Sequence, residues 1–186
     1  MPSPGVTKRM LADAMKDLMA TRPLAKISVG DIVSECNLNR NSFYYHFKDK
    51  YDLVNWVFYT EIIDELTEAE SDGDSSWDMI GKVCVFFHNN KDFYANALSV
   101  SGQNSFSEYF ADLLMDLVRI RAEGIVGNNE YEEFCASFFV DAITLSLFRW
   151  IKEGAKIPPQ EFVQMLKKAA NSMALMVEDG DKILLN

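Results

Sequence analysis

Apolar residues recur along this chain at intervals of three and four positions, the spacing of helices that each bury one face. A first stripe runs from Met10 to Met19, between Thr7, a candidate cap, and Pro23, which ends the helix. Strand-like alternation is absent. The pattern predicts further helices at about residues 28–35, 40–47, 49–69, 77–90, 92–101, 104–123, 130–153 and 159–179. We therefore expect an all-α protein of about nine helices.

Residues 26–56 carry the signals of two short helices joined by a tight turn. Ser28 is a good N-cap, and Asp31 places an acidic group in the first turn of its helix. Asn37 tolerates the left-handed conformation that the turn needs, and Asn39 can cap the next helix. These features predict an N-terminal three-helix head of the helix-turn-helix type, followed by a larger C-terminal helical body.

The helix that starts after Asn39 has the side chains expected of a helix that reads DNA. Such a helix needs short polar groups that reach base edges and donors that grip phosphates on either side. Phe43 and Phe47, four residues apart, are expected to point into the core instead. The alternative is a helical hairpin whose polar face is merely solvated. Two adjacent tyrosines would have no function on such a face. The candidate DNA-binding residues are Ser28, Asn39, Arg40, Asn41, Ser42, Tyr44, Tyr45, His46, Lys48 and Lys50.

The distribution of charge changes what the total suggests. The net charge of −10 and the pI of about 4.7 argue, taken alone, against nucleic-acid binding. Residues 1–50, however, hold eight Lys or Arg against five Asp or Glu, whereas the remainder holds 10 against 23. A basic head on an acidic body would keep DNA at one end. We accordingly divide the chain into a DNA-binding domain, 1–50, and a ligand-binding and dimerisation domain, 51–186.

The segment NLNRNSFYYHFKDKYDL resembles the N-terminal domain of the TetR family of bacterial transcription regulators, over the region from Lys8 to about Glu61. The shared features are a small-residue turn, a polar pair, an aromatic run ending in tyrosine, histidine and phenylalanine, and a lysine-rich hinge. Asn37 and Asn41 stand where the family often has glycine or another small residue. With the later FRWIKEGAKIPPQEF, the chain is similar to a subset that includes regulators of dihydroxyacetone-kinase operons.

This resemblance implies a homodimer that binds double-stranded DNA at a palindromic operator, with a body that binds a small inducer and pairs through its last two helices. In agreement, the helix at 130–153 is apolar nearly all round. The expected dimer-interface residues are Phe138, Leu145, Arg149, Phe162, Leu166, Ala169 and Met173. The candidate ligand-pocket residues are Phe86, Phe87, Tyr94, Phe106, Phe110 and Phe139, although aromatic stripes at helical spacing are also typical of plain core.

Other function classes find little in the sequence. The three cysteines, Cys36, Cys84 and Cys135, are widely spaced in apolar contexts, which indicates reduced core thiols. With only His46 and His88 available, a histidine-based metal site is not expected, and no cofactor is predicted. There is no nucleophile motif or glycine-rich phosphate loop, so we do not expect an enzyme. No apolar run is long enough for a membrane helix or a signal segment, which predicts a cytoplasmic protein.

Two ways of controlling such a regulator remain open from the sequence. The body could respond to an unknown small-molecule effector, or it could be a docking module for a co-activator or other co-regulator protein. An open cavity in the body would favour the first hypothesis, and a closed, packed core would favour the second. Whether the outcome is repression or activation is not encoded in these patterns.

Overall fold

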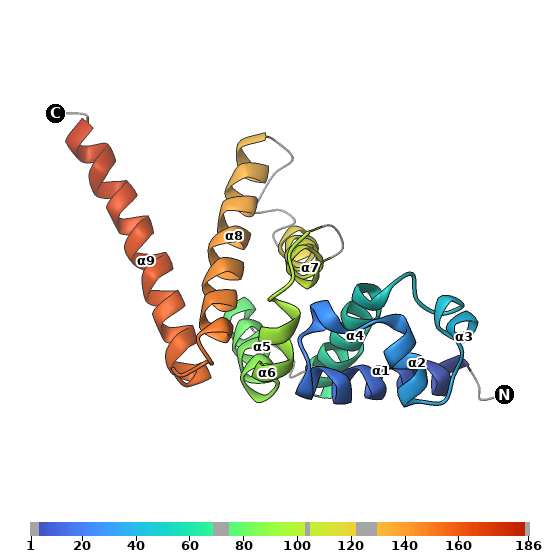
Figure 1. Cartoon of the computed structure of the whole chain (residues 1–186). Helices are drawn as coiled ribbons and strands as arrows, with labels where there is room; N and C mark the ends of the chain where they lie inside the picture. The colour runs from blue at the N-terminus through green and yellow to red at the C-terminus, as the bar shows by residue number, and fades with distance from the viewer. Residues whose placement is uncertain (1–3, 69–74, 103–104, 122–129, 185–186) are drawn as a thin grey trace.

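The computed structural model of the chain describes residues 4–68, 75–102, 105–121 and 130–184, and the regular elements in these ranges are all helical (Figure 1). The all-α prediction is therefore confirmed. The helices are α1 (Pro4–Thr21), the short 3-10 helix η1 (Leu24–Lys26), α2 (Val29–Glu35), α3 (Arg40–Tyr44), α4 (Lys50–Glu68), α5 (Ser76–Asn89), α6 (Lys91–Ala97), α7 (Phe106–Arg121), α8 (Glu130–Lys152) and α9 (Pro159–Leu184).

Several helix ends differ from the prediction. Helix α1 begins at Pro4, so the predicted cap Thr7 lies inside the helix, where it is buried. Proline fits a first helical position because its fixed φ suits the helix and its missing N–H would have had no partner there. Helix α3 ends at Tyr44 and is followed by a turn, and α9 continues to Leu184. The short helix η1, which lies between Pro23 and α2, was not predicted.

Helices α1, α2, α3 and the start of α4 form the head (Figure 1). Helix α1 packs against α2 and α4, while α2 packs against α3. Phe43 and Phe47 are buried in this core, as predicted, and Leu11 and Met15 of α1 are fully buried with them. A charged pair between Lys16 and Glu61 also joins α1 to α4.

The body is built by α5 to α9 on the far part of α4. Helix α5 packs against α9, and α7 packs against α8. In Figure 1, α8 and α9 extend on the side of the molecule away from α3. Because α4 contacts both α1 and α5, it belongs to the head and to the body at once. The domain boundary at residue 50 therefore stays a proposal.

The centre of the body is filled by aromatic rings that touch one another. We call Phe58, Phe86, Phe87, Tyr94, Phe106 and Phe110 the aromatic cluster; each is at most 5% exposed. The ring of Phe58 lies parallel to Phe87 at 5.6 Å between centroids and edge-on to Phe106 at 5.2 Å. Such pairs add to the free energy gained from burying the rings. The cluster joins α4 to α5, α6 and α7.

Candidate DNA-binding interface

The turn between α2 and α3 has the geometry that the sequence predicted. Asn37 adopts a positive φ of 53°, the left-handed conformation that asparagine tolerates better than most residues. Beside it, the Leu38 N–H donates to the carbonyl of Val33 at 2.8 Å and closes the end of α2. Asn39 then caps α3, because its side-chain oxygen accepts the Ser42 N–H at 2.9 Å. These local bonds fix the angle at which α3 leaves α2.

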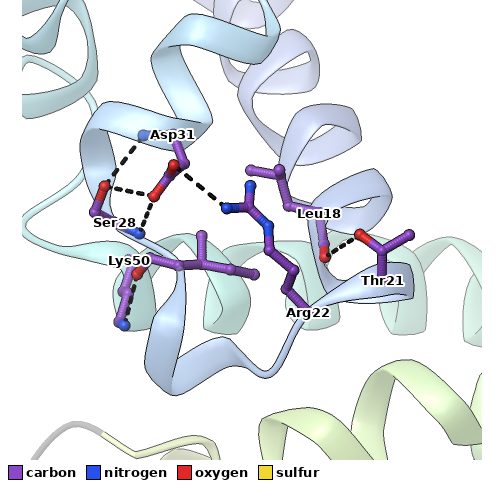
Figure 2. Close-up of polar contacts among 7 residues, drawn as sticks. Leu18, Thr21, Arg22, Ser28, Asp31 and Lys50 are labelled. Atoms are coloured by element: carbon purple, nitrogen blue, oxygen red, sulfur yellow. Dashed lines mark hydrogen bonds and ion pairs between the residues drawn. The ribbon is translucent and has the colours of Figure 1, made fainter.

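The start of α2 is held by a complete capping box. Ser28 Oγ accepts the Asp31 N–H at 3.2 Å, and Asp31 Oδ2 accepts the Ser28 N–H at 2.8 Å and its hydroxyl at 2.6 Å. Figure 2 shows Asp31 between Ser28 and Arg22, whose guanidinium lies 3.4 Å away. The Ser28 hydroxyl and N–H, with Arg22, lower the pKa of the Asp31 carboxyl to about 2.

The candidate reading residues lie on the outside of the head. Tyr44 is 57% exposed and Tyr45 79%, whereas the neighbouring Phe43 is fully buried. Asn39, Arg40, Asn41 and Lys48 are exposed as well, and Ser42 and His46 are partly exposed. The His46 ring packs against the edge of Tyr45 at 4.9 Å. Exposed tyrosines next to short polar residues supply donors and flat surfaces that suit a nucleic-acid backbone.

Arg40 lies across the start of α2. A Cβ added at Gly30 would come within 3.0 Å of the Arg40 guanidinium, so the bare glycine backbone makes room for this side chain. The exposed guanidinium thus sits at the junction of α2 and α3, beside Ser28 Oγ, from which the same Cβ would be 3.4 Å away. Two predicted DNA-binding residues, Arg40 and Ser28, are thereby brought together.

Like the capping side chains of Ser28 and Asn39, the ammonium group of Lys50 is already engaged in hydrogen bonds. Its Nζ donates to the carbonyls of Leu24 at 2.7 Å, Ile27 at 2.8 Å and Ala25 at 3.3 Å. Burial lowers the pKa of Lys50, and the nearby Asp49 acts in the opposite direction. The phosphate contact expected of Lys50 stays a prediction, and it would need some of these bonds to open.

In the body, the structure brings five of the six pocket candidates together and separates the sixth. Phe86, Phe87, Tyr94, Phe106 and Phe110 belong to the aromatic cluster. Phe139 is 38% exposed on α8, where its ring lies 6.4 Å from Trp77. The ring at the centre of the cluster, Phe58, was missed. It lies four residues after Val54 and four before Ile62, both buried, so the helical spacing carried the signal.

Polar groups are scarce in this part of the body. Among the described residues, the fully buried Tyr94 hydroxyl has no hydrogen-bond partner. Burial, together with the charge of Glu61, raises the pKa of Tyr94 well above its usual value. His88 is partly buried and its ring stacks on Trp150 at 6.1 Å. Burial also raises the pKa of the Cys84 thiol to about 12, as expected of an inert core cysteine.

The predicted dimer residues differ in how far they are exposed. Phe138 (52% exposed), Leu145 (64% exposed) and Arg149 lie on one exposed stripe of α8. Phe162 is instead buried within the chain, with its ring stacked on Trp150 at 4.6 Å. Ala169 is exposed and Leu166 is half-buried on α9, whereas the side chain of Met173 lies outside the described residues.

One contact that sequence reasoning missed joins the two parts of the molecule. Asn96 of α6 bonds to the backbone around Leu24, which lies 72 positions earlier in the chain. No local pattern marks such a residue, because its partners become neighbours only after folding.

Over the described residues, no group of His, Cys, Asp and Glu could hold a metal ion, and no helix is long and apolar enough to cross a membrane.

Comparisons with known proteins agree with this geometry. A family model described as bacterial regulatory proteins, tetR family, matches residues 11–57, and one described as a transcriptional regulator C-terminal region, TetR_C_8, matches residues 74–172. The dhaKLM operon transcriptional activator DhaS of Lactococcus lactis is 34% identical over 67 residues, which are 36% of this chain and 35% of that protein.

Nearly the whole chain aligns with solved structures at low sequence identity. A structure of the dihydroxyacetone kinase operon activator DhaS matches with a TM-score of 0.60 and 20% identity, covering 93% of this chain and 97% of that one. FadR of Thermus thermophilus, a transcriptional repressor in complex with lauroyl-CoA, matches with a TM-score of 0.56 and 14% identity, covering 88% and 91%. At these identities the likeness shows the fold alone.

Proposed function

Because this chain belongs to the TetR family of bacterial transcription regulators and is a DNA-binding regulator, we propose that it binds a palindromic operator as a homodimer under the control of an effector at its body. The observation that carries this proposal is the exposed polar face of α3 and its following turn. It combines Asn41 with Tyr44 and Tyr45, on a helix whose opposite face is anchored by the buried Phe43.

Each reading residue has a proposed role. Asn41 and Ser42, near the start of α3, reach base edges in the major groove, and Arg40 donates to guanine or to phosphate. Tyr44, Tyr45, His46 and Lys48 contact phosphate or sugar from the flanks, and Ser28 does so from the start of α2. The mildly basic head faces the DNA and the acidic body faces away.

Dimerisation is supported by the α8 stripe, which comprises Phe134, Phe138, Ala142, Leu145 and Arg149, all of them exposed. Exposed apolar side chains that form one continuous face are typical of a surface that a partner covers. Two heads on one operator need a fixed separation of about one turn of DNA, and pairing through the body supplies it.

The effector is proposed to act by favouring one separation of the heads over another. A small molecule bound at the body is one candidate; the structural neighbour FadR carries lauroyl-CoA. The second candidate, a partner protein that docks on the body, is favoured by the direct ring-to-ring packing of the aromatic cluster. A co-crystal structure, or a titration with candidate metabolites followed by calorimetry, distinguishes a small-molecule effector from a partner protein.

The DNA proposal is tested by fluorescence anisotropy with the upstream DNA of the protein's own operon and a scrambled control, at several salt concentrations. We expect salt-sensitive, sequence-selective binding. Tyr44→Ala should weaken binding to all sequences alike, whereas Asn41→Ala should relax base preference by about 1–3 kcal/mol. Gln160→Ala, an exposed change on α9, is the matched control. Equal loss in both reading variants, with selectivity intact, contradicts these roles.

The dimer proposal is tested by sedimentation velocity. Leu145→Asp places a charge in the α8 stripe and should convert a dimer into a monomer. Ile63→Asp, which places the same charge at an exposed apolar residue of α4, is the control and should leave the dimer intact. A wild-type protein that sediments as a monomer at micromolar concentration would rule the dimer out.

A further inference from the structure

The segment that joins α1 to α2 is held by side chains from two other parts of the chain. From the body, Asn96 of α6 accepts the Leu24 N–H on its side-chain oxygen at 2.7 Å. The Nδ2 of the same amide donates to the carbonyls of Met19 at 2.9 Å and Arg22 at 2.8 Å. One side chain thus binds both the end of α1 and the start of η1.

These three bonds also fix the orientation of the Asn96 amide. Exchanging its oxygen and nitrogen would set NH2 against the Leu24 N–H and the oxygen against two carbonyls, so every bond would be lost. Both carbonyls and the N–H belong to backbone at a helix end, where the helix itself supplies no partners. An asparagine, with one acceptor and two donors on one short arm, satisfies all three.

Lys50 binds the same segment from the start of α4. Its ammonium donates to the carbonyl of Leu24 at 2.7 Å and to that of Ile27 at 2.8 Å. Leu24 is therefore held by two hydrogen bonds: its N–H donates to Asn96 in the body, and its C=O accepts from Lys50 of α4. Ile27 leads directly into Ser28, the cap of α2, and Figure 2 shows Lys50 beside that cap. We call Asn96, η1 and Lys50 the bracket.

Helix α6 also reaches the centre of the body. Tyr94, two residues before Asn96, is fully buried in the aromatic cluster, with ring contacts at 4.9 Å to Phe87 and 5.1 Å to Phe106. Helix α6 has only seven residues, Lys91–Ala97, so a shift of the Tyr94 side of this helix moves Asn96 with it. One short helix thus touches both the packed interior and the backbone of the head.

We propose that Asn96 is a positioning residue that couples α6 to the DNA-binding head through the bracket. A displacement of α6 changes the position of η1. Because η1 leads into the first turn of α2, the angle of α3 changes with it. This inference rests on the proposed DNA-binding role of α3, since it specifies how the body sets the position of that helix. Asn96 itself touches no DNA.

The test compares three variants of the full-length protein. Asn96→Ala removes all three bonds, and Asn96→Asp keeps an acceptor for the Leu24 N–H but has no donors for the two carbonyls. Asn90→Ala is the matched control: the Asn90 side chain also bonds to a backbone carbonyl, that of Phe86 at 3.0 Å, but within the body. Amide hydrogen exchange and DNA binding are measured for each variant.

Asn96→Ala should speed amide exchange at Leu24 and throughout α2 and α3, and Asn90→Ala should not. The ratio of affinities for the proper DNA and for scrambled DNA should fall about tenfold, because three bonds of ordinary strength no longer hold the head in place. Affinity for scrambled DNA should stay unchanged, since no charge at the DNA is altered. Asn96→Asp should change both measurements at least as much as Asn96→Ala, because its second carboxylate oxygen would face the carbonyls of Met19 and Arg22.

Two results would overturn the coupling. In the first, exchange increases only at Leu24 and leaves Val29–Tyr44 unchanged. In the second, selective and scrambled binding fall together, in proportion to the unfolded fraction, which is the signature of a merely structural residue. If the wild type itself shows no preference between the two DNAs, the proposed function fails, and the exchange of α2 and α3 still decides whether the bracket couples α6 to the head.

Discussion

The head and the body of this protein are held by different kinds of interaction. In the head, short polar side chains cap helices within three residues of themselves, as Ser28 does with Asp31 and Asn39 does with Ser42. In the body, rings from three helices pack around Phe58 of α4, and the buried Tyr94 hydroxyl has no partner among the residues that the structure describes. Hydrogen bonds are directional, so they set the angles between helices, as a DNA-binding head requires. Ring packing fills volume and leaves the arrangement of the helices more adaptable.

The largest effect that would test this contrast is Phe58→Ala. Removing the central ring of the aromatic cluster should destabilise the protein by about 3–5 kcal/mol, because a cavity replaces contacts with six neighbouring rings. Chemical denaturation followed by circular dichroism measures the change. The counterpart is Tyr45→Ala, at a residue 79% exposed, which should leave stability unchanged and weaken DNA binding. If Phe58→Ala lowers the free energy of unfolding by less than about 1 kcal/mol, the aromatic cluster does not stabilise the body.

A smaller effect is expected at the turn of the head. Asn37→Ala should destabilise by about 1–2 kcal/mol, because an alanine pays the full cost of the left-handed conformation that Asn37 adopts. Asn37→Gly, which removes that steric cost, is the control and should be close to neutral or slightly stabilising. Thermal unfolding of the three proteins measures the difference. Equal losses in both variants would show that the Asn37 side chain, rather than its backbone, matters.

The capping box should make the head sensitive to acid. Ser28→Ala should cost about 1 kcal/mol near neutral pH. The pKa of Asp31 is lowered to about 2 in the folded protein, against 3.8 for the unperturbed group. Its contribution is therefore complete above about pH 4 and is lost as the pH falls toward 2. Denaturation between pH 6 and pH 2 should show a shallower decline for Asp31→Asn than for wild type, and identical slopes would remove Asp31 as a cause.

The smallest stability effect, at Gly30→Ala, separates folding from function. Alanine favours the helix by at most about 1 kcal/mol over glycine, so the variant should be as stable as wild type or slightly more so. The new Cβ, 3.0 Å from the Arg40 guanidinium, should nevertheless displace that side chain and weaken DNA binding. Fluorescence anisotropy and thermal unfolding on the same samples show whether DNA binding and stability change independently. Unchanged binding would argue that Arg40 does not act from this position.

Much of the head was predictable because its determinants are local. Ser28, Asn37 and Asn39 each act on backbone within a few residues, and the structure confirms the predicted caps and turn. The exposed and buried sides of α3 followed from helical spacing. The start of α1 was predicted wrongly because Thr7 looks like a cap, although Pro4 fits the first position of a longer helix.

What could not be predicted depends on residues that meet only after folding. The engagement of Lys50 by three carbonyls needs the position of η1, a helix of three residues with no periodic pattern. Asn96 could not be singled out from an unremarkable polar position on α6. Phe162 stays a predicted dimer residue, and its spacing on α9 could not reveal that its ring stacks on Trp150 within the chain. Long-range partners leave no local trace in a single sequence.

The exposed stripe on α8 has a consequence for dosage. If two copies must meet to cover it, the amount of paired protein rises with the square of the free monomer concentration at low abundance. Occupancy of a promoter would then respond to synthesis more steeply than it would for a reader that works alone. The apolar side chains of one helix would thus set a threshold in gene expression, below which newly made chains have little effect.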